Sequence, residues 1–228
     1  MCGRFTQLFT YAELHEYWRS FTDPLPVTAT NMQPRWHLCP TDPVWTITHS
    51  EKDGIKLEHV RWGLAPFWWK IPLKKLPATF NARAETVAEK PMFREAFKYR
   101  RGIIPASGWC EWQDREDGKQ PWYFTPANEP IALIAALWET WKNPENKEEV
   151  VRSSTMVITE PNQFVAQYHD RMPVVLDRTN VMDWLTGAQG VELLKPAPED
   201  VLKAWPVLRR VNSSKAPDEP TLIEPVNL

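Results

Sequence analysis

Residues 102–138, GIIPASGWCEWQDREDGKQPWYFTPANEPIALIAALW, decide the fold class of this chain. Residues 102–112, 122–125 and 131–138 are rich in the β-branched and aromatic side chains that favour extended strands. Between the first two runs, residues 113–120 are charged and contain Asp117-Gly118, a pair typical of a tight turn. The segment therefore predicts three strands joined by short connections, and strands joined in this way pair antiparallel.

The sequence on either side continues this pattern. Residues 44–48 and 57–62 flank an Asp53-Gly54 turn and predict a hairpin, and residues 154–159 predict a further strand.

Helices are predicted to be short. Residues 11–21 carry an apolar stripe at helical spacing after Thr10, a suitable N-cap. Further helices are expected at 86–100, broken or begun near Pro91, at 180–185 and at 199–204. Strands dominate, so we expect the α+β class: one domain over residues 1–228, with a largely antiparallel, barrel-like β-sheet core flanked by short helices.

Composition narrows the function classes. Of 228 residues, 43% are hydrophobic and 25% charged, as in ordinary globular proteins. The three cysteines have no metal-ligand spacing and are odd in number, which argues against a disulfide framework and predicts no metal and no cofactor. No apolar run is long enough to span a bilayer. We expect a cytoplasmic monomer that does not bind membranes, associated with the nucleoid if the source is bacterial.

Positive charge is concentrated in one stretch. Residues 61–101 hold ten basic and three acidic side chains, a net charge of +7, although the whole chain carries −2. Trp62, Trp68 and Trp69 are interleaved with these charges. Such a pattern is typical of a surface that follows phosphates and stacks bases. An ordinary solvated surface accounts for the charges equally well, so both interpretations stay open at this point.

The chain begins Met1-Cys2-Gly3-Arg4. Methionine is commonly removed before a small residue, which would leave Cys2 with an adjacent thiol and α-amine. That amine has an unperturbed pKa of about 7.7–8.0 and is partly nucleophilic near neutrality. It can form a Schiff base with an aldehyde, which the thiol then closes into a thiazolidine. The alternative is that a small second residue serves processing alone.

Three other clusters contain candidate catalytic groups. Asn81 and Arg83 could orient a sugar oxygen and a phosphate, although Asn81 could instead cap a helix. Glu111 lies between tryptophans, where desolvation would raise its pKa for acid–base work, and alternation places it opposite Cys110. A half-exposed surface Glu is the alternative. His169 could shuttle a proton or simply cap a turn. The chain lacks phosphate-loop, dinucleotide-loop and serine-hydrolase motifs.

Taken together, these clusters resemble the SRAP family of abasic-site processing proteins. The matching pieces are collinear and span most of the chain: residues 1–5 (MCGRF), 40–41 (PT), 61–66 (RWGLAP) with 68–69 (WW), 81–86 (NARAET), 104–109 (IPASGW) with 111–112 (EW), and 169–173 (HDRMP).

The resemblance implies a partner and a chemistry. The partner is single-stranded DNA containing an abasic site, and the product is a thiazolidine DNA–protein cross-link that protects the lesion in the DNA damage response. It implies lyase-like Schiff-base chemistry and possible autoproteolytic removal of Met1, which an aminopeptidase would explain as well. Two alternatives stay open: a noncatalytic single-stranded DNA binding module, and a peptidase acting on its own N-terminus.

The resemblance also assigns roles to residues. Cys2 is the nucleophile, Asn81 orients the terminal cysteine or the sugar, Glu111 handles protons on the amine and sugar, and His169 assists ring opening and reversal of the link. Three arginines would hold phosphates and two tryptophans would form a wedge beside the lesion: Arg4, Arg83, Arg171, Trp68 and Trp69.

Two positions depart from the family pattern. Cys39 and Cys110 stand where alanine and an aromatic residue are more usual, and both are expected to be small buried hydrophobes. Cys110 could instead be a second thiol near the site.

Overall fold

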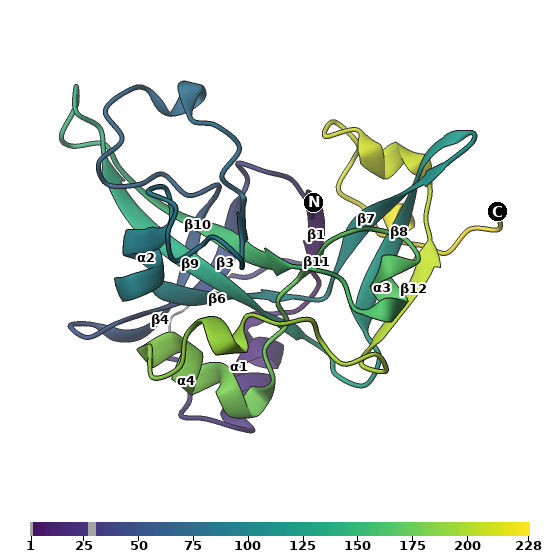
Figure 1. Cartoon of the computed structure of the whole chain (residues 1–228), viewed down its shortest axis with the longest axis horizontal. Coiled ribbons are helices and arrows are strands. Elements are labelled where there is room, and N and C mark those ends of the chain that lie inside the picture. Colours follow the sequence, from purple (N-terminus) through teal and green to yellow (C-terminus); the bar gives the residue numbers. More distant parts are fainter. Residues whose placement is uncertain (1, 27–30) are drawn as a thin grey trace.

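Five strands close into a barrel in the computed structural model, which describes residues 2–26 and 31–228 (Figure 1). Around the ring they are β10 (Val150–Thr159), β4 (Gly54–Trp62), β3 (Pro43–Ser50), β6 (Arg101–Ala106) and β9 (Ala132–Lys142). β9 pairs with β10 and completes the ring. Within the ring, only the β10–β4 pairing is parallel. The predicted hairpin at Asp53-Gly54 is confirmed, with Gly54 in the left-handed region at φ 65°.

A second sheet stands beside the barrel. Its order is β12 (Leu202–Pro206), β8 (Gly118–Pro126), β7 (Gly108–Arg115), β1 (Arg4–Gln7) and β2 (Arg35–Leu38), and all its pairings are antiparallel. The two sheets share a buried cluster that contains side chains from β1, β7 and β8 together with side chains from β6, β9 and β10. The predicted α+β class with a largely antiparallel, barrel-like core is therefore confirmed.

The predicted strand at 102–112 is wrong in one respect, because it is two strands in two sheets. β6 ends at Ala106 and β7 begins at Gly108. Between them, the Ser107 N–H donates to Thr6 O (2.9 Å), its hydroxyl accepts from Leu8 N (2.8 Å), and its carbonyl accepts from the Thr125 hydroxyl (2.7 Å). Hydrogen bonds to the second sheet thus replace pairing with β9 and redirect the chain. This break carries Glu111 out of the barrel and into the sheet that contains β1.

The helices are short and lie outside the sheets. α1 (Tyr11–Arg19) begins at the predicted cap Thr10, which forms a capping box with Glu13. The helix expected at 86–100 is confined to α2 (Arg94–Tyr99), and the one at 180–185 is α4 (Val181–Thr186). The helix expected at 199–204 is wrong, since Leu202–Pro206 is the edge strand β12, paired with β8. Backbone pairing with a neighbouring strand has overridden local propensity there.

The remaining elements are small. β10 pairs along its second half with β5 (Asn81–Arg83) on one side and β11 (Met172–Pro173) on the other. A four-residue helix, α3 (Gln163–Ala166), precedes β11. The described residues also include five 3-10 helices: η1 (Leu73–Lys75), η2 (Arg178–Asn180), η3 (Val191–Leu193), η4 (Arg209–Asn212) and η5 (Pro220–Leu222). None of the described helices is long and apolar enough to cross a membrane.

Candidate active site

Four polar side chains from distant parts of the sequence meet where the barrel and the second sheet join. Cys2 immediately precedes β1, Asn81 begins β5, Glu111 lies in β7, and His169 lies between α3 and β11. Pairing of β5 and β11 with β10 brings the segments of Asn81 and His169 to the same edge. Pairing of β1 with β7 brings Cys2 toward Glu111. Tertiary structure therefore assembles the four residues that the sequence identified separately.

The backbone register fixes the nucleophile candidate. Arg4 lies opposite Cys110, and continuing that register by one residue places Gly3 opposite Glu111. The Cys2 side chain is fully buried, and its thiol lies 3.7 Å from Arg4 O. The Asn81 amide Nδ2 donates to Cys2 O over 2.8 Å. Asn81 is thus a strand residue that holds the Cys2 backbone, and its alternative role as a helix cap is excluded.

Glu111 is fully buried. As strand alternation predicted, Cys110 and Trp112 pack on the opposite face of β7, in a small cluster with Tyr123 and residues 207–223. Burial raises the pKa of the Glu111 carboxyl to about 8. The half-exposed surface Glu is therefore excluded, and this carboxyl is largely protonated at neutral pH.

His169 completes a candidate proton-transfer pair. Its Nδ1 lies 3.5 Å from Glu111 Oε2 and 3.4 Å from Asp170 Oδ1. The same nitrogen is 3.0 Å from the N–H of Arg171, so the ring also closes the turn that leads into β11. Burial lowers the pKa of the imidazole. His169 is thus a neutral base beside a protonated acid near pH 7, which suits exchange of a proton between them.

The thiols are all protonated near neutrality. Burial raises the pKa of Cys2 well above its usual range, and the neighbouring Glu111 charge adds to this effect. Burial also raises the pKa of Cys110 to about 12 and raises that of Cys39. Cys39 and Cys110 are buried, as predicted. Cys110 faces away from Glu111, which argues against its acting as a second thiol in the site.

The candidate phosphate-binding arginines differ in their present contacts. The Arg4 guanidinium bonds His37 Nε2 (3.1 Å), Gly3 O (2.7 Å) and Asn212 O (3.1 Å). It therefore ties β1 to β2 and η4 as well as lying beside Cys2. Arg171 forms an ion pair with Glu85. The sequence named neither His37 nor Glu85 for these contacts, and no local signal pairs residues so far apart.

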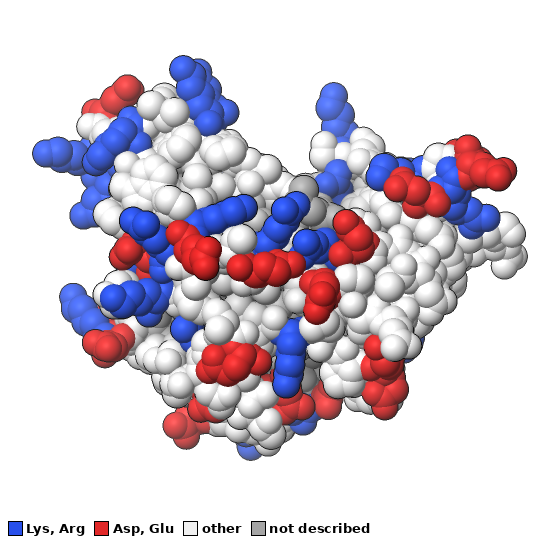
Figure 2. Space-filling model, in the orientation of Figure 1, with Lys and Arg blue, Asp and Glu red and all other residues white. Residues whose placement is uncertain are grey.

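Arg83 is exposed on β5, two positions beyond Asn81 and so on the same face of that strand. Trp68 and Trp69 are half-buried, with ring centroids 6.2 Å apart. They lie in the loop formed by residues 63–80, which Figure 1 shows rising beside the upper end of β1. In Figure 2 the surface is hollowed between this lobe and the lobe that contains η4, and Lys and Arg side chains gather around the hollow.

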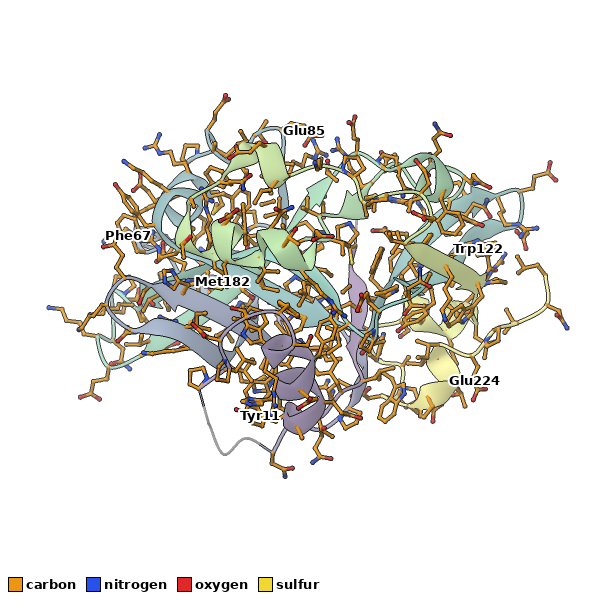
Figure 3. The ribbon with its side chains drawn as sticks, turned by 90° about the horizontal axis from the view of Figure 1, so that it is seen from below. Tyr11, Phe67, Glu85, Trp122, Met182 and Glu224 are labelled. Carbon is orange, nitrogen blue, oxygen red and sulfur yellow. The ribbon has the colours of Figure 1, made fainter. Side chains whose placement is uncertain are left out.

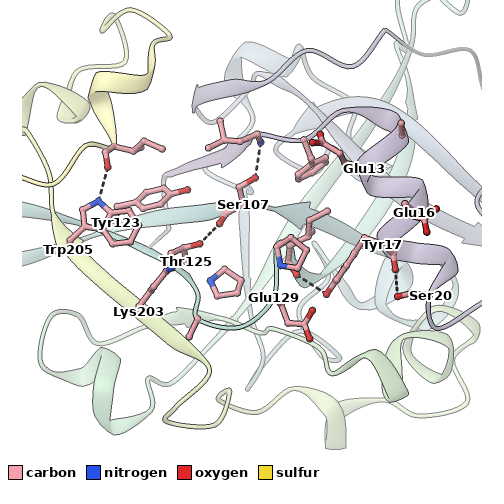
Figure 4. Close-up of a pocket in the computed structure, with 18 residues that line it drawn as sticks. Glu13, Glu16, Tyr17, Ser20, Ser107, Tyr123, Thr125, Glu129, Lys203 and Trp205 are labelled. Atoms are coloured by element: carbon pink, nitrogen blue, oxygen red, sulfur yellow. Dashed lines mark hydrogen bonds between the residues drawn. The ribbon is translucent and has the colours of Figure 1, made fainter.

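A separate wide groove of about 1070 Å³ lies between α1 and the strands β8 and β12 (Figure 4). Its lining includes Tyr17, Ser107 and Lys203, and none of the four clustered residues. The described residues contain no group of three or more His, Cys, Asp or Glu side chains that could hold a metal ion.

A buried cysteine before an N-terminal strand, beside a protonated carboxyl and a neutral imidazole, defines a protein built for nucleophilic and acid–base chemistry at its own N-terminus. The profile of the family described as SOS response associated peptidase (SRAP) matches residues 1–214. This chain belongs to the SRAP family.

Relatives cover nearly the whole chain. The abasic site processing protein YoqW of Bacillus subtilis is 33% identical over 234 residues, covering 98% of this chain and 99% of the relative. The abasic site processing protein YedK of Escherichia coli is 30% identical, covering 99% and 100%. A solved structure from Bacteroides thetaiotaomicron superposes with a TM-score of 0.83 at 22% identity, covering 99% of this chain and all of that one, and supports the fold alone.

Proposed function

We propose that this protein recognises abasic sites in single-stranded DNA and links itself to them covalently through Cys2 once Met1 has been removed. The observation that carries the proposal is the meeting of Cys2 with Glu111, whose pKa burial raises to about 8, and with Asn81 and His169. Membership of a family whose relatives are named abasic site processing proteins supports the choice of substrate. The product is a thiazolidine.

The first step opens the sugar. An abasic deoxyribose is mostly a closed hemiacetal, and its aldehyde appears when the C1 hydroxyl loses a proton and the ring oxygen gains one. Neutral His169 can take the first proton and protonated Glu111 can give the second. Because His169 Nδ1 lies 3.5 Å from Glu111 Oε2, the pair can then return to its starting state by exchanging a proton.

The second step forms the link. The α-amine of Cys2 attacks the aldehyde carbon, a C–N bond forms, the amine proton passes to the Glu111 carboxylate, and water leaves as the imine forms. The Cys2 sulfur then adds to the imine carbon, and the thiol proton moves to the nitrogen. A protonated thiol suits this order, because the amine acts first. Asn81 fixes the Cys2 carbonyl and so limits where the amine and the thiol can lie.

We assign DNA binding to the residues around the hollow. Trp68 and Trp69 would stack on bases beside the lesion, and Arg83 would hold a phosphate. Arg171 would exchange Glu85 for a phosphate, and Arg4, already bonded within the protein, would act at the same end of β1. The protein would act in the DNA damage response as a cytoplasmic monomer.

Removal of Met1 is a second proposed activity, favoured by the word peptidase in the family's description. Met1 lies outside the described residues. Glu111 is the candidate acid–base group for self-cleavage. A Glu111→Gln chain that keeps Met1, beside a wild-type chain that loses it in the same host, would assign the cleavage to the protein. Loss of Met1 from both would assign it to an aminopeptidase.

The test is intact mass spectrometry before and after incubation with a single-stranded oligonucleotide containing one abasic site. We expect a chain without Met1 and a heat-stable adduct that maps to Cys2. The control is Cys2→Ala, which should bind the oligonucleotide without forming the adduct. A processed wild-type chain that binds but gives no adduct would leave a noncatalytic DNA-binding protein and overturn the proposal.

A further inference from the structure

The loop of residues 63–80 carries more positive charge than the proposed lesion site uses. It contains Lys70, Lys74 and Lys75 and no acidic residue. All three lysines are exposed, and none forms an ion pair with another residue in the part of the chain that the structure describes. Lys74 and Lys75 belong to η1, a 3-10 helix with no buried residue. Three uncompensated cations therefore lie on one face-forming segment.

The loop is well anchored despite its length. At its base, Leu64 N donates to Thr79 O over 3.2 Å. Further out, Trp141 Nε1 of β9 donates to Trp69 O (2.7 Å), and Trp69 N donates to Pro66 O (2.9 Å). Proline at 66, 72 and 77 further restricts the backbone. Long ordered loops are usually functional, and one that is already ordered loses little conformational entropy when it binds.

Apolar side chains are exposed on the same loop. Phe67 is 53% exposed and Ile71 is 44% exposed. Figure 3 shows Phe67 at the outer margin of the molecule. The Arg100 guanidinium lies 6.0 Å from the Phe67 ring, and its ion pair with buried Glu139 (2.7 Å) fixes that group in place. An aromatic ring is thus presented to solvent on a fixed support beside unpaired lysines.

We propose that the outer loop face, made of Phe67, Lys70, Ile71, Lys74 and Lys75, binds the DNA strand that continues from the lesion on one side. Lysines beside an exposed aromatic ring are the combination that binds single strands without reading their sequence. Charge complementarity and continuity with Trp68 and Trp69 favour DNA over a protein partner. The inference rests on the proposed function, because those tryptophans are assigned to the lesion end of the same strand.

The test compares oligonucleotides that carry a tetrahydrofuran abasic analogue, which cannot form the aldehyde, so that only noncovalent affinity is measured. One is 5 nucleotides long with the analogue in the middle; two others extend it by about 10 nucleotides on the 5′ side or on the 3′ side. The triple variant Lys70→Ala, Lys74→Ala, Lys75→Ala should bind one extended oligonucleotide about tenfold more weakly. Its slope of log K against log salt should fall by about 2, from roughly 0.7 for each lost phosphate contact on single strands.

The matched control is Lys52→Ala, Lys56→Ala, Lys195→Ala, which removes the same charge from exposed positions elsewhere. The control should leave the affinity for both extensions unchanged. Phe67→Ala should weaken binding of the same extension about fivefold or more, because base–aromatic stacking is lost. Equal losses by the two triple variants, or equal losses on both extensions, would show a general charge effect and overturn the inference.

Cross-linking to the 5-nucleotide oligonucleotide, made with a true abasic site, separates the two proposals. The Lys70, Lys74 and Lys75 variant should cross-link at the wild-type rate. No adduct with any chain would overturn the proposed function, whereas normal adduct formation with unchanged affinity for both extensions would overturn only the assignment of the outer loop face.

Discussion

Replacing Glu111 by glutamine should stabilise the fold increasingly as pH rises. The carboxyl is fully buried, and its pKa in the fold is about 8 against an ordinary 4.5. Between these values the unfolded chain is ionised while the folded chain keeps its proton. The folded state binds more protons, so stability falls by about 1.4 kcal/mol per pH unit, or about 5 kcal/mol over the whole window. The glutamine side chain of the variant does not titrate, so its stability has no such dependence.

Urea denaturation of both proteins at intervals between pH 5 and 9, with the N-terminal residue established by mass, measures this difference. Glutamine is nearly isosteric with glutamate, so packing differences add a constant offset. The stability of Glu111→Gln relative to wild type should rise by about 1.4 kcal/mol per pH unit from pH 5 and level off above pH 8. Parallel stability curves would falsify the argument, since they would mean that Glu111 is ionised in the fold and cannot donate a proton near neutrality.

Three further predictions concern single residues. Cys2→Ser should form an imine that borohydride traps but no heat-stable adduct, because a hydroxyl adds less readily than a thiol; the absence of any trapped imine would argue against attack by the amine. Asn81→Ala removes a hydrogen bond worth about 1 kcal/mol and should slow cross-linking about fivefold or more with unchanged affinity for the tetrahydrofuran analogue, and an unchanged rate would remove Asn81 from the mechanism. A Cβ at Gly108 would lie 2.4 Å from Phe124 O and from the Tyr123 ring, so Gly108→Ala should destabilise the fold by about 3 kcal/mol in urea, and a wild-type midpoint would contradict this close packing.

Local features of the sequence predicted local features of the fold. Thr10 with Glu13 marked the start of α1, and Asp53-Gly54 and Asp117-Gly118 marked two hairpins, because capping and turn chemistry depend on adjacent residues. Alternation along 109–112 correctly separated the face of Glu111 from that of Cys110. The sequence did not reveal the break at Ser107 or the strand β12, because both depend on hydrogen bonds to strands distant in the chain.

The contacts of the arginines were equally hidden. Arg4 and Arg171 were expected to be available for phosphates, yet Arg4 bonds Asn212 O across more than 200 residues and Arg171 pairs with Glu85. Charge counted along a sequence indicates which segments are basic but not which cations are already paired. The lysines of the outer loop face, which lack ion pairs among the described residues, could be distinguished from the arginines only in three dimensions.

By itself, the sequence determined the strand-rich α+β class, the four chemically capable residues and the family to which they belong, because side-chain chemistry and the two-residue period of strands are properties of the local chain. Only the tertiary structure decided that Glu111 is buried, that Asn81 holds Cys2, and that His169 lies beside the carboxyl. The period of a strand tells which side chains share a face, but what covers that face depends on the other strands. Here the covering is what removes water from Glu111 and raises its pKa.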